Sequence, residues 1–440
     1  MAGVDMGRVQ RIAVIGSGIS GLASAWLLGR RHAVTLYEAN DYLGGHTHTH
    51  EVRVGGHDHR VDTGFIVFNP AHYPLLTRLF EELGVRSQPT QMSLSVRNEM
   101  SGLEYNATSL ATLFCQRRNL VSPRFFGLIR DILRFNREAR ALLSVAGPGP
   151  TLGEYLAQHG YGAAFRDDHL VPMSSALWSA PPREVLEFPA KYLVQFLANH
   201  EMLQVSGRAP WRVVQGGSST YIQALTARWN VTTRLGCPVM GIERSSSHVT
   251  VDSLAGRERY DQVVLACHSD QALELLHTPT RAERDVLGAI GYQPNRVILH
   301  TDASVMPQRP RAWAAWNALI PREPETACTV SYWMNLLQGI DSAEPLIVTL
   351  NPTRSIDPAK VLRSLRYAHP VYTHASVAAR ARKAEIQGAS RTWFAGAYWG
   401  WGFHEDGMRS AVEVAAALEV PWPAHAMRPA PLPAARELAA

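Results

Sequence analysis

Apolar residues fall into short runs and helical repeats that alternate along the chain. Arg11–Ile15 and Val34–Tyr37 have the length and content of buried strands, and residues 22–28 between them have helical spacing. Residues 71–207 are predicted to be mostly helical, with Tyr73–Leu83 as one amphipathic candidate. Further strands are predicted at Asp261–Ala266, Arg296–His300, Thr329–Trp333 and Leu346–Leu350. The alternation near the start predicts an α/β fold.

Length and composition are those of a large globular protein. The 440 residues are enough for two domains, and 46% hydrophobic with 18% charged residues allows sizeable cores. The cysteines are Cys115, Cys237, Cys267 and Cys328. They include no CxxC pair, which excludes a dithiol redox centre and a clustered zinc site and suits a reducing compartment. The net charge of +5 is mild, and no interleaved basic and aromatic repeat indicates nucleic-acid binding.

Neither a signal peptide nor a membrane span is predicted. The first apolar run, Ile12–Ile15, is too short for the core of a signal peptide. No stretch approaches the roughly 18–20 apolar residues that a membrane span needs. We therefore expect a cytoplasmic protein, with peripheral contact to the inner face of the membrane as an alternative that stays open.

A glycine-rich turn follows the first strand directly and consists of Gly16-Ser17-Gly18-Ile19-Ser20-Gly21. In a dinucleotide-binding unit, Gly16 permits the tight turn, Gly18 lets the backbone approach the pyrophosphate, and Gly21 lets helix and strand pack closely. The N-terminus of the helix offers N–H groups to the phosphates. Glu38, about 20 residues on at the end of the second strand, can accept hydrogen bonds from a ribose. The complete strand–turn–helix–strand–acid frame predicts dinucleotide binding.

Motifs further along the chain distinguish FAD from NAD. Tyr42-Leu43-Gly44-Gly45-His46 follows the acid, and the strand-like Val61-Asp62-Thr63-Gly64-Phe65 comes next. Far downstream, Trp393-Phe394-Ala395-Gly396-Ala397 precedes Gly407-Met408-Arg409-Ser410-Ala411, which is predicted to open a last helix. Over nearly its whole length the chain resembles the flavin amine oxidase and phytoene desaturase superfamily. There the first motif continues into a Gly-Gly step, and a C-terminal strand precedes a glycine-rich helix start.

The resemblance implies FAD as the cofactor and a set of residues that hold it. The backbone around Val239, in a strand predicted over residues 231–243, would meet the adenine. The N–H groups near Gly407 and Met408 would face the flavin pyrimidine carbonyl, where the helix dipole stabilises reduced flavin. The expected cofactor-binding residues are Gly16, Gly18, Ile19, Ser20, Gly21, Glu38, Gly44, Gly45, His46, Thr63, Gly64, Phe65, Val239, Gly396, Gly407 and Met408.

The same resemblance implies two interleaved domains. A Rossmann-like (GR2-type) FAD-binding domain is expected from residues 8–70, 208–288 and 390–420. An α+β substrate domain is expected from residues 71–207 and 289–389, and residues 421–440, rich in Pro and Ala, are expected to form a flexible tail.

The chain departs from the amine oxidase pattern in three places. His46 stands where many members have arginine, and none of the three lysines lies in a recognisable motif. No cysteine follows Cys328, so a cysteinyl flavin is not expected and FAD is predicted to bind non-covalently. On a strand, His46, His48 and His50 would share one face. A metal site and a histidyl flavin are alternatives, but an ordinary strand beside the cofactor is preferred, with no metal.

Aromatic residues crowd the segment just before the predicted last helix, namely Tyr398, Trp399, Trp401 and Phe403. The resemblance implies that such residues wall the flavin ring and hold an apolar substrate against it. His404 and Glu405 are the nearby groups able to move a proton near neutral pH. We hypothesise that His404 accepts a proton as hydride passes to flavin N5. The alternative is that His404 and Glu405 only brace the loop.

The segment 117–143 interleaves arginines with apolar residues, and helical spacing places Phe125, Ile129 and Ile132 on one stripe. A basic amphipathic helix can lie on an anionic lipid surface, although a solvated cover over the substrate domain explains it as well.

Three stretches carry the resemblance to a bacterial group of predicted NAD/FAD-binding proteins, namely residues 45–49, 62–69 and 403–407. Members of that group tend to accompany cyclopropane fatty-acid synthases. The resemblance therefore implies oxidation or desaturation of a fatty-acyl lipid, with a lipid methyltransferase as a candidate partner. A flavin amine oxidase and a non-catalytic flavin-bearing partner of such a methyltransferase are the alternatives.

Overall fold

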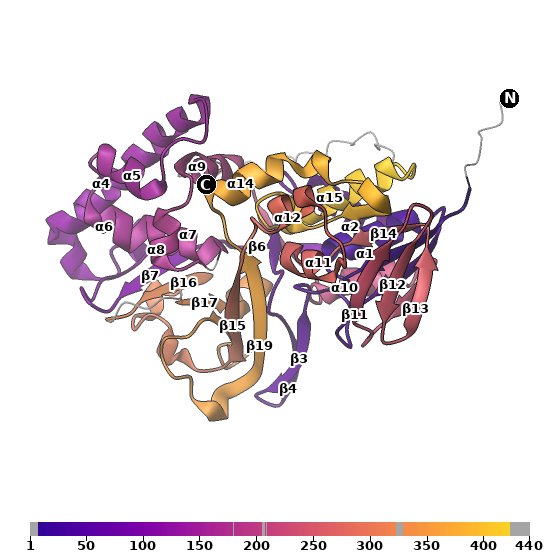
Figure 1. Ribbon diagram of the computed structural model, residues 1–440. Helices are drawn as coiled ribbons and strands as arrows, with labels where there is room; N and C mark the ends of the chain where they lie inside the picture. Colours follow the sequence, from indigo (N-terminus) through magenta and orange to yellow (C-terminus); the bar gives the residue numbers. More distant parts are fainter. Residues whose placement is uncertain (1–7, 179, 205–206, 208, 323–328, 423–440) are drawn as a thin grey trace, which may run out of the picture.

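A parallel sheet forms the centre of one half of the molecule, on the right in Figure 1. The computed structural model describes residues 8–178, 180–204, 207, 209–322 and 329–422. The strands of this sheet lie in the order β10–β2–β1–β14–β20. They are β10 (Val231–Arg234), β2 (Ala33–Tyr37), β1 (Arg11–Ile15), β14 (Gln262–Leu265) and β20 (Thr392–Phe394). All neighbours pair in parallel, so the predicted α/β fold is confirmed.

Helices cover this sheet and bury its apolar side chains. α1 (Ile19–Leu28) is buried along its whole length, as expected of a helix that is apolar all round. It packs against α15 (His404–Ala417), and α2 (Pro74–Leu83) and α10 (Ser219–Thr226) join the same core. α2 begins with Pro74 and ends at Gly84, whose left-handed φ of 72° stops the helix.

Three predicted elements have different bounds in the structure. The single strand expected over residues 231–243 is two strands, because the chain turns at Gly236 before β11 (Val239–Arg244). β11, β12 (Val249–Ser253) and β13 (Gly256–Tyr260) form a separate antiparallel sheet. The strand expected to run through Phe65 ends at Asp62, and the helix expected to open at Gly407 already begins at His404.

A second large sheet has the order β19–β15–β18–β17–β16–β7–β8. Its strands are β19 (Val361–Pro370), β15 (Tyr292–His300), β18 (Ile347–Leu350), β17 (Thr329–Trp333), β16 (Trp316–Ile320), β7 (Leu94–Asn98) and β8 (Glu104–Asn106). Three of them match predicted runs, whereas β19, the longest, was not predicted.

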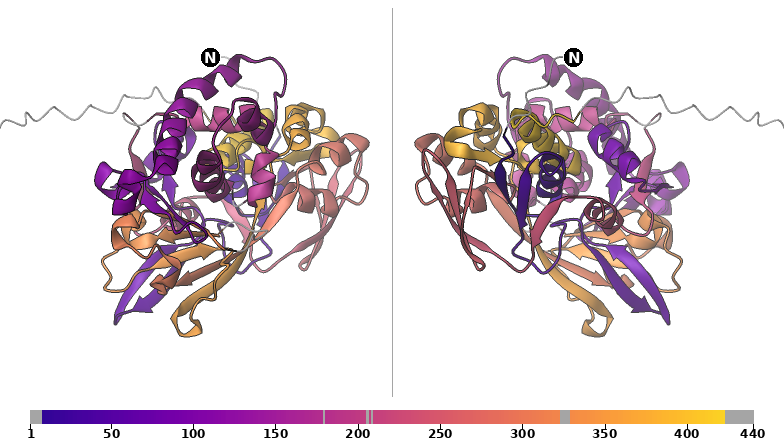
Figure 2. Two further views of the ribbon diagram at one scale, coloured as in Figure 1. Left: turned by 90° about the vertical axis from the view of Figure 1, so that its left-hand side faces the viewer. Right: turned by 90° about the vertical axis from the view of Figure 1, so that its right-hand side faces the viewer.

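A helical layer lies over the β7–β16 side of that sheet in Figure 1. It contains α3 (Leu110–Leu113), α4 (Pro123–Glu138), α5 (Leu152–Gln158), α6 (Ala163–Phe165), α7 (Val171–Trp178), α8 (Pro182–Leu186) and α9 (Ala190–Asn199). The turned views of Figure 2 place this layer on the side of the molecule opposite the β11–β13 sheet. Shorter helices elsewhere are α11 (Ser269–Leu275), α12 (Arg281–Leu287), α13 (Met334–Gln338) and α14 (His374–Ala381).

Two small sheets link the large ones. β3 (Thr49–Val54) and β4 (His57–Asp62) form a hairpin, and β9 (Trp211–Val214) pairs with both β5 (Val67–Phe68) and β6 (Ser87–Thr90). The buried Asp62 carboxylate accepts hydrogen bonds from Ser218 of one half and Gln338 of the other. The division into FAD-binding and substrate domains at the bounds given above stays a prediction.

The C-terminal segment is packed further than expected. Trp422 is buried against Trp26, with ring centres 5.5 Å apart, and its indole N–H donates to Glu82. The rest of the predicted tail, residues 423–440, lies outside the described residues. Among the helices that the structure describes, none is long and apolar enough to cross a bilayer.

Candidate active site

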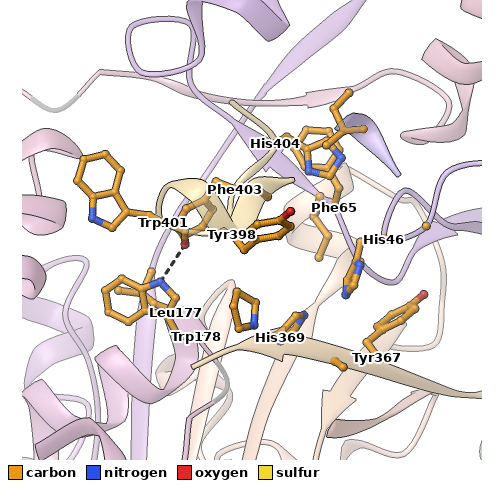
Figure 3. Close-up of a pocket in the computed structure, with 18 of the residues that line it drawn as sticks. His46, Phe65, Leu177, Trp178, Tyr367, His369, Tyr398, Trp401, Phe403 and His404 are labelled. Carbon is orange, nitrogen blue, oxygen red and sulfur yellow. Dashed lines mark hydrogen bonds between the residues drawn. The ribbon is translucent and has the colours of Figure 1, made fainter. Parts of the chain in front are cut away.

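A cavity of about 1460 Å³ runs from the carboxyl ends of β1 and β2 to the helices α4, α7 and α9. Ligands of open parallel sheets bind at the carboxyl ends of the strands, where loops rather than strands form the wall. Figure 3 shows the middle of this cavity, with histidine and aromatic side chains pointing into it from several separate segments.

The glycine-rich turn forms the wall at the sheet end, and its glycines do different jobs. Gly16 has φ 98°, which a residue with a side chain rarely adopts. A Cβ on Gly21 would lie 1.8 Å from the carbonyl oxygen of Gly16, so close packing of helix on turn requires glycine there. A Cβ on Gly18 would meet no atom within 4 Å, and Gly18 lines the cavity. That open space over the turn fits a pyrophosphate.

Glu38 is held in place at the end of β2. Its carboxylate accepts hydrogen bonds from the backbone N–H of Ser17 at 2.9 Å and the Ser17 hydroxyl at 2.6 Å. The backbone and side-chain N–H groups of Asn40 donate to the other oxygen, both at 2.8 Å. The buried carboxylate lines the cavity, together with Val239 of β11. This is the arrangement that the ribose and adenine of a dinucleotide require.

The second glycine pair and the Thr63–Phe65 segment lie against the first turn. The N–H of Gly44 donates to Ser17 O at 3.1 Å, and a Cβ on Gly45 would lie 3.1 Å from the Cα of Gly18. A Cβ on Gly64 would be 2.1 Å from the carbonyl oxygen of His46. Residues 44–46, 63–65 and Gly396 all line the cavity. Motifs far apart in the sequence therefore form one continuous wall whose shape and polar groups fit FAD.

Gly407 and Met408 lie elsewhere than predicted. The N–H groups of Asp406 and Gly407 donate to the carbonyl of Phe403 at 3.0 and 3.2 Å, inside the first turn of α15. Met408 is buried in the core, and neither Gly407 nor Met408 lines the cavity. Because α15 begins at His404, the first-turn N–H groups without an intrahelical acceptor are those of His404 and Glu405. The positive end of the helix dipole therefore lies at His404.

Histidine imidazoles gather on one side of the cavity (Figure 3). The ring of His46 lies 4.9 Å from that of Tyr367 and 5.1 Å from that of His369, between ring centres. Burial lowers the pKa of His46 well below its usual value, and burial lowers the pKa of His369 to about 4. Both are therefore neutral at physiological pH. Nε2 of His46 is buried without a hydrogen-bond partner in the described structure, and a bound cofactor can supply one.

Only part of the common face expected from His46, His48 and His50 is formed, by His48 and His50, whose ring centres lie 3.9 Å apart. β3 begins only at Thr49, so the two earlier histidines lie in a loop. His48 stacks on Tyr42 with ring centres 4.0 Å apart, whereas His46 lines the cavity. Within the part of the chain that the structure describes, no group of His, Cys, Asp or Glu side chains is arranged to hold a metal ion.

His404 lies in the cavity wall at the start of α15. Its ring stacks on Phe65 with centres 3.7 Å apart, and its Nε2 lies 2.9 Å from Thr47 Oγ1. Thr47 Oγ1 is in turn 2.6 Å from the hydroxyl of the buried Tyr221. Burial lowers the pKa of His404 to about 3, so the imidazole is neutral and linked to a chain of hydroxyls.

Glu405 points away from the cavity. Its carboxylate accepts hydrogen bonds from the N–H groups of Leu75 and Leu76, both at 3.0 Å, and so caps the N-terminus of α2. Burial raises the pKa of Glu405 to about 7. The structure therefore supports a bracing role for Glu405, which was the alternative to proton transfer.

Replacing Glu405 with alanine is expected to lower the stability of the protein by about 1–3 kcal/mol, because two N–H groups lose their acceptor. Flavin reduction by substrate should be unchanged, since the carboxylate does not line the cavity. Thermal unfolding and single-turnover flavin reduction measure the two effects separately. A variant with full stability and slow reduction would contradict the bracing role.

The aromatic segment before α15 is divided between cavity and core. Tyr398, Trp401 and Phe403 line the cavity, whereas Trp399 packs in the neighbouring core and donates to Phe394 O at 3.0 Å. The Asp406 carboxylate fixes the loop by accepting from the N–H groups of Trp401 at 2.9 Å and Phe403 at 3.1 Å. Three of the four predicted wall residues are therefore placed where a substrate could touch them.

The far arm of the cavity is mainly apolar, although the polar side chains of Asn136, His169 and His200 also line the cavity among these helices. It extends from Phe403 between the helices and the second sheet, and its apolar walls include Ile129, Ile132, Leu133, Phe135, Phe165, Leu170, Met173, Leu177, Trp178, Phe196, Leu197, Trp316 and Leu350. The acidic residues in the cavity wall, Glu38, Asp270 and Glu274, belong to the dinucleotide end. The described walls of the arm thus offer no carboxylate to a cationic substrate.

The family model for flavin containing amine oxidoreductases matches residues 19–345. The chain belongs to this family. It is an FAD-dependent oxidoreductase, as the cofactor site and the family together establish. A search of curated proteins finds no significant sequence match.

Solved structures of this oxidoreductase fold match almost end to end. A CLA-producing fatty acid isomerase from P. acnes is 16% identical, with a TM-score of 0.67 over 94% of this chain and 99% of its own. A cyclohexylamine oxidase from Brevibacterium oxydans IH-35A is 17% identical, with a TM-score of 0.66 over 93% and 99%. A putrescine oxidase is 14% identical, with a TM-score of 0.66 over 94% and 99%. At these identities the similarity establishes the fold.

Lysine plays no part in the cavity of this oxidoreductase. Lys191 donates to Val145 O, Lys383 pairs with Glu413, and Lys360 precedes β19; none of them lines the cavity. The described lining of the cavity therefore contains no lysine.

Several residues of the site were missed by the sequence analysis. Tyr367 and His369 lie two apart on β19 and reach the cavity from the same strand. Their period-2 spacing was a usable signal, but arginines interrupt the apolar pattern of this strand. Thr47 lies in the 45–49 stretch that carries the resemblance, but nothing in the sequence pairs it with Tyr221; the fold brings both hydroxyls into one chain with His404.

Proposed function

We propose that this enzyme oxidises or desaturates a fatty-acyl chain, carried by a phospholipid. The observation that supports the proposal is the far arm, whose described walls are mainly aliphatic and aromatic, whereas the described acidic residues of the cavity lie at the dinucleotide end. An acyl chain loses water-exposed apolar surface along the whole arm, which favours binding by about 25 cal/mol per Å² buried. An ammonium group would find no carboxylate in the described walls of the arm.

FAD, when bound, supplies a two-electron hydride acceptor. A desaturation also releases a proton from the neighbouring carbon of the acyl chain. His404 is the proposed acceptor of that proton. Its imidazole is neutral, so a ring nitrogen is free to take up the proton. A negative charge that arrives in the same cavity with the hydride would raise the pKa of His404, because an anion stabilises the imidazolium. Dioxygen or another acceptor would then remove the two electrons.

Other observations agree with this proposal without deciding it. One structural neighbour is a fatty acid isomerase, so the fold accommodates acyl chains in at least one protein. Two others are amine oxidases, and an amine oxidase activity is therefore the second candidate. The third candidate is a non-catalytic flavin-bearing partner of a lipid methyltransferase.

The deciding experiment is an anaerobic titration of the purified holoprotein, followed by the flavin absorbance. Unsaturated or methylated phospholipids should bleach the flavin, and cyclohexylamine and putrescine should not. Bleaching by the amines alone would overturn the proposal in favour of an amine oxidase. If lipids, amines and NAD(P)H all leave the flavin oxidised, the non-catalytic role takes its place.

A further inference from the structure

We propose that the exposed stripe of α4, together with the turn before it, docks on an anionic phospholipid bilayer beside the mouth of the apolar arm. This inference rests on the proposed function, because it supplies the route by which a bilayer lipid reaches the cavity. It names the lipid surface as the partner of a face that the fold leaves uncovered. The stripe consists of Phe126, Arg130, Leu133 and Arg137 on α4 and Val121 in the preceding turn.

Apolar and basic residues alternate along the stripe, and their side chains are exposed to solvent. Phe126 is 48% exposed and Leu133, two helical turns later, 53% exposed. Arg130 and Arg137 follow each of them by one turn and have side chains 73% and 76% exposed. Because i, i+4, i+7 and i+11 fall on one helical face, these four side chains form a single line. Val121 extends the apolar surface and is 81% exposed.

The sequence analysis placed the apolar face of this helix elsewhere. The stripe predicted from Phe125, Ile129 and Ile132 turns inward, since Phe125 is buried in a core and Ile129 and Ile132 line the cavity. Leu133 belongs to both faces, because it lines the cavity and is half exposed. The edge of the arm therefore reaches the surface at Leu133, directly beside the exposed stripe. α4 lies at the outer edge of the helical layer in Figure 1.

Charge points to an anionic bilayer as the occupant. Residues 117–143 hold seven arginines and two carboxylates, a net charge of +5 that equals the net charge of the whole 440-residue chain. Among the residues that the structure describes, Arg130 and Arg137 pair with the adjacent carboxylates, Asp131 at 3.1 Å and Glu138 at 3.0 Å. Both guanidinium groups are largely exposed, although the Asp131 carboxylate is buried, and each guanidinium keeps further N–H donors for lipid phosphates. Apolar side chains between arginines suit the boundary between headgroups and acyl chains.

Cosedimentation of the holoprotein with vesicles tests the proposal. We expect binding to phosphatidylcholine vesicles that contain phosphatidylglycerol, weaker binding to pure phosphatidylcholine, and loss of binding at high salt. Replacing both arginines, as R130Q with R137Q, should weaken binding to the anionic vesicles about 30-fold, because each basic side chain contributes about fivefold. Phe126→Asp with Leu133→Asp should weaken binding to both kinds of vesicle.

Matched controls exist on elements that are separate from α4. Leu254 in the β12–β13 turn and Arg281 at the start of α12 are also exposed, so L254D and R281Q should bind vesicles like the wild type. Binding is scored without flavin chemistry, so a flavin that lipids fail to bleach would not change this result. Equal binding by the stripe variants and the controls would overturn the proposal. So would a wild-type dimer that only the stripe variants break, because the stripe would then be a contact between two copies.

Discussion

Gly18→Ala is expected to lower the affinity for FAD by about 10- to 100-fold and to leave the stability of the apoprotein almost unchanged. The backbone of Gly18 has φ −61° and ψ 177°, which alanine adopts without strain, and the added methyl meets no protein atom within 4 Å. The methyl would instead fill the space over the turn that a pyrophosphate needs. Overpacking by one such group costs about 1–3 kcal/mol, which gives the expected loss of affinity.

Two further glycines make this test specific. A Cβ on Gly21 would overlap the Gly16 carbonyl, so Gly21→Ala should lower both the FAD affinity and the melting temperature of the apoprotein. A Cβ on Gly127, in α4 and far from the turn, meets nothing within 4 Å, so Gly127→Ala should leave FAD binding as it is. Titration of the apoprotein with FAD and thermal unfolding give the two readouts. Tight FAD binding by Gly18→Ala would mean that the pyrophosphate lies elsewhere.

The cofactor end of the site was predictable because its residues act through the backbone. A turn that approaches a pyrophosphate needs glycine at fixed spacing, and a strand that ends beside a ribose needs an acidic residue. The Gly16–Gly21 turn and Glu38 can therefore be located from the amino-acid sequence alone. The structure places both at one end of the cavity. Local chemistry of this kind does not depend on what the rest of the chain does.

The start of the last helix was not predictable in the same way. Gly407 has a weak helix propensity, which is typical of a residue near a helix end, but in the structure it lies within α15. Glycine is required at this position because a side chain would collide with Ile19 and Ser20 of α1. Close packing between two helices, and not the end of one, explains this glycine. The proton-transfer candidate likewise depends on the fold: sequence proximity paired Glu405 with His404, whereas their side chains point to α2 and to the cavity.

His404→Ala is expected to slow flavin reduction by a bound substrate at least about 100-fold while FAD stays bound, as for loss of a general base. His404→Gln should be about as slow, because an amide can hydrogen-bond to Thr47 but cannot take up a proton near neutral pH. Recovery of the rate by glutamine would make His404 a positioning residue. Thr47→Val, which keeps the shape and removes the hydroxyl, should cause a smaller loss.

The pH dependence gives a second, independent test of His404. A base must be deprotonated before it can act, and the lowered pKa of about 3 keeps this imidazole deprotonated well below pH 5. The rate of flavin reduction in the wild type should therefore stay level as the pH falls from 8 to 5. With the ordinary histidine pKa of about 6.5, only about 3% of the imidazole would be neutral at pH 5, and the rate would fall about 30-fold. Stopped-flow measurement of flavin reduction across this pH range separates the two cases. A level profile, together with a slow alanine variant, identifies His404 as a base that burial keeps deprotonated. A 30-fold decline would show that a group with an ordinary pKa controls the step.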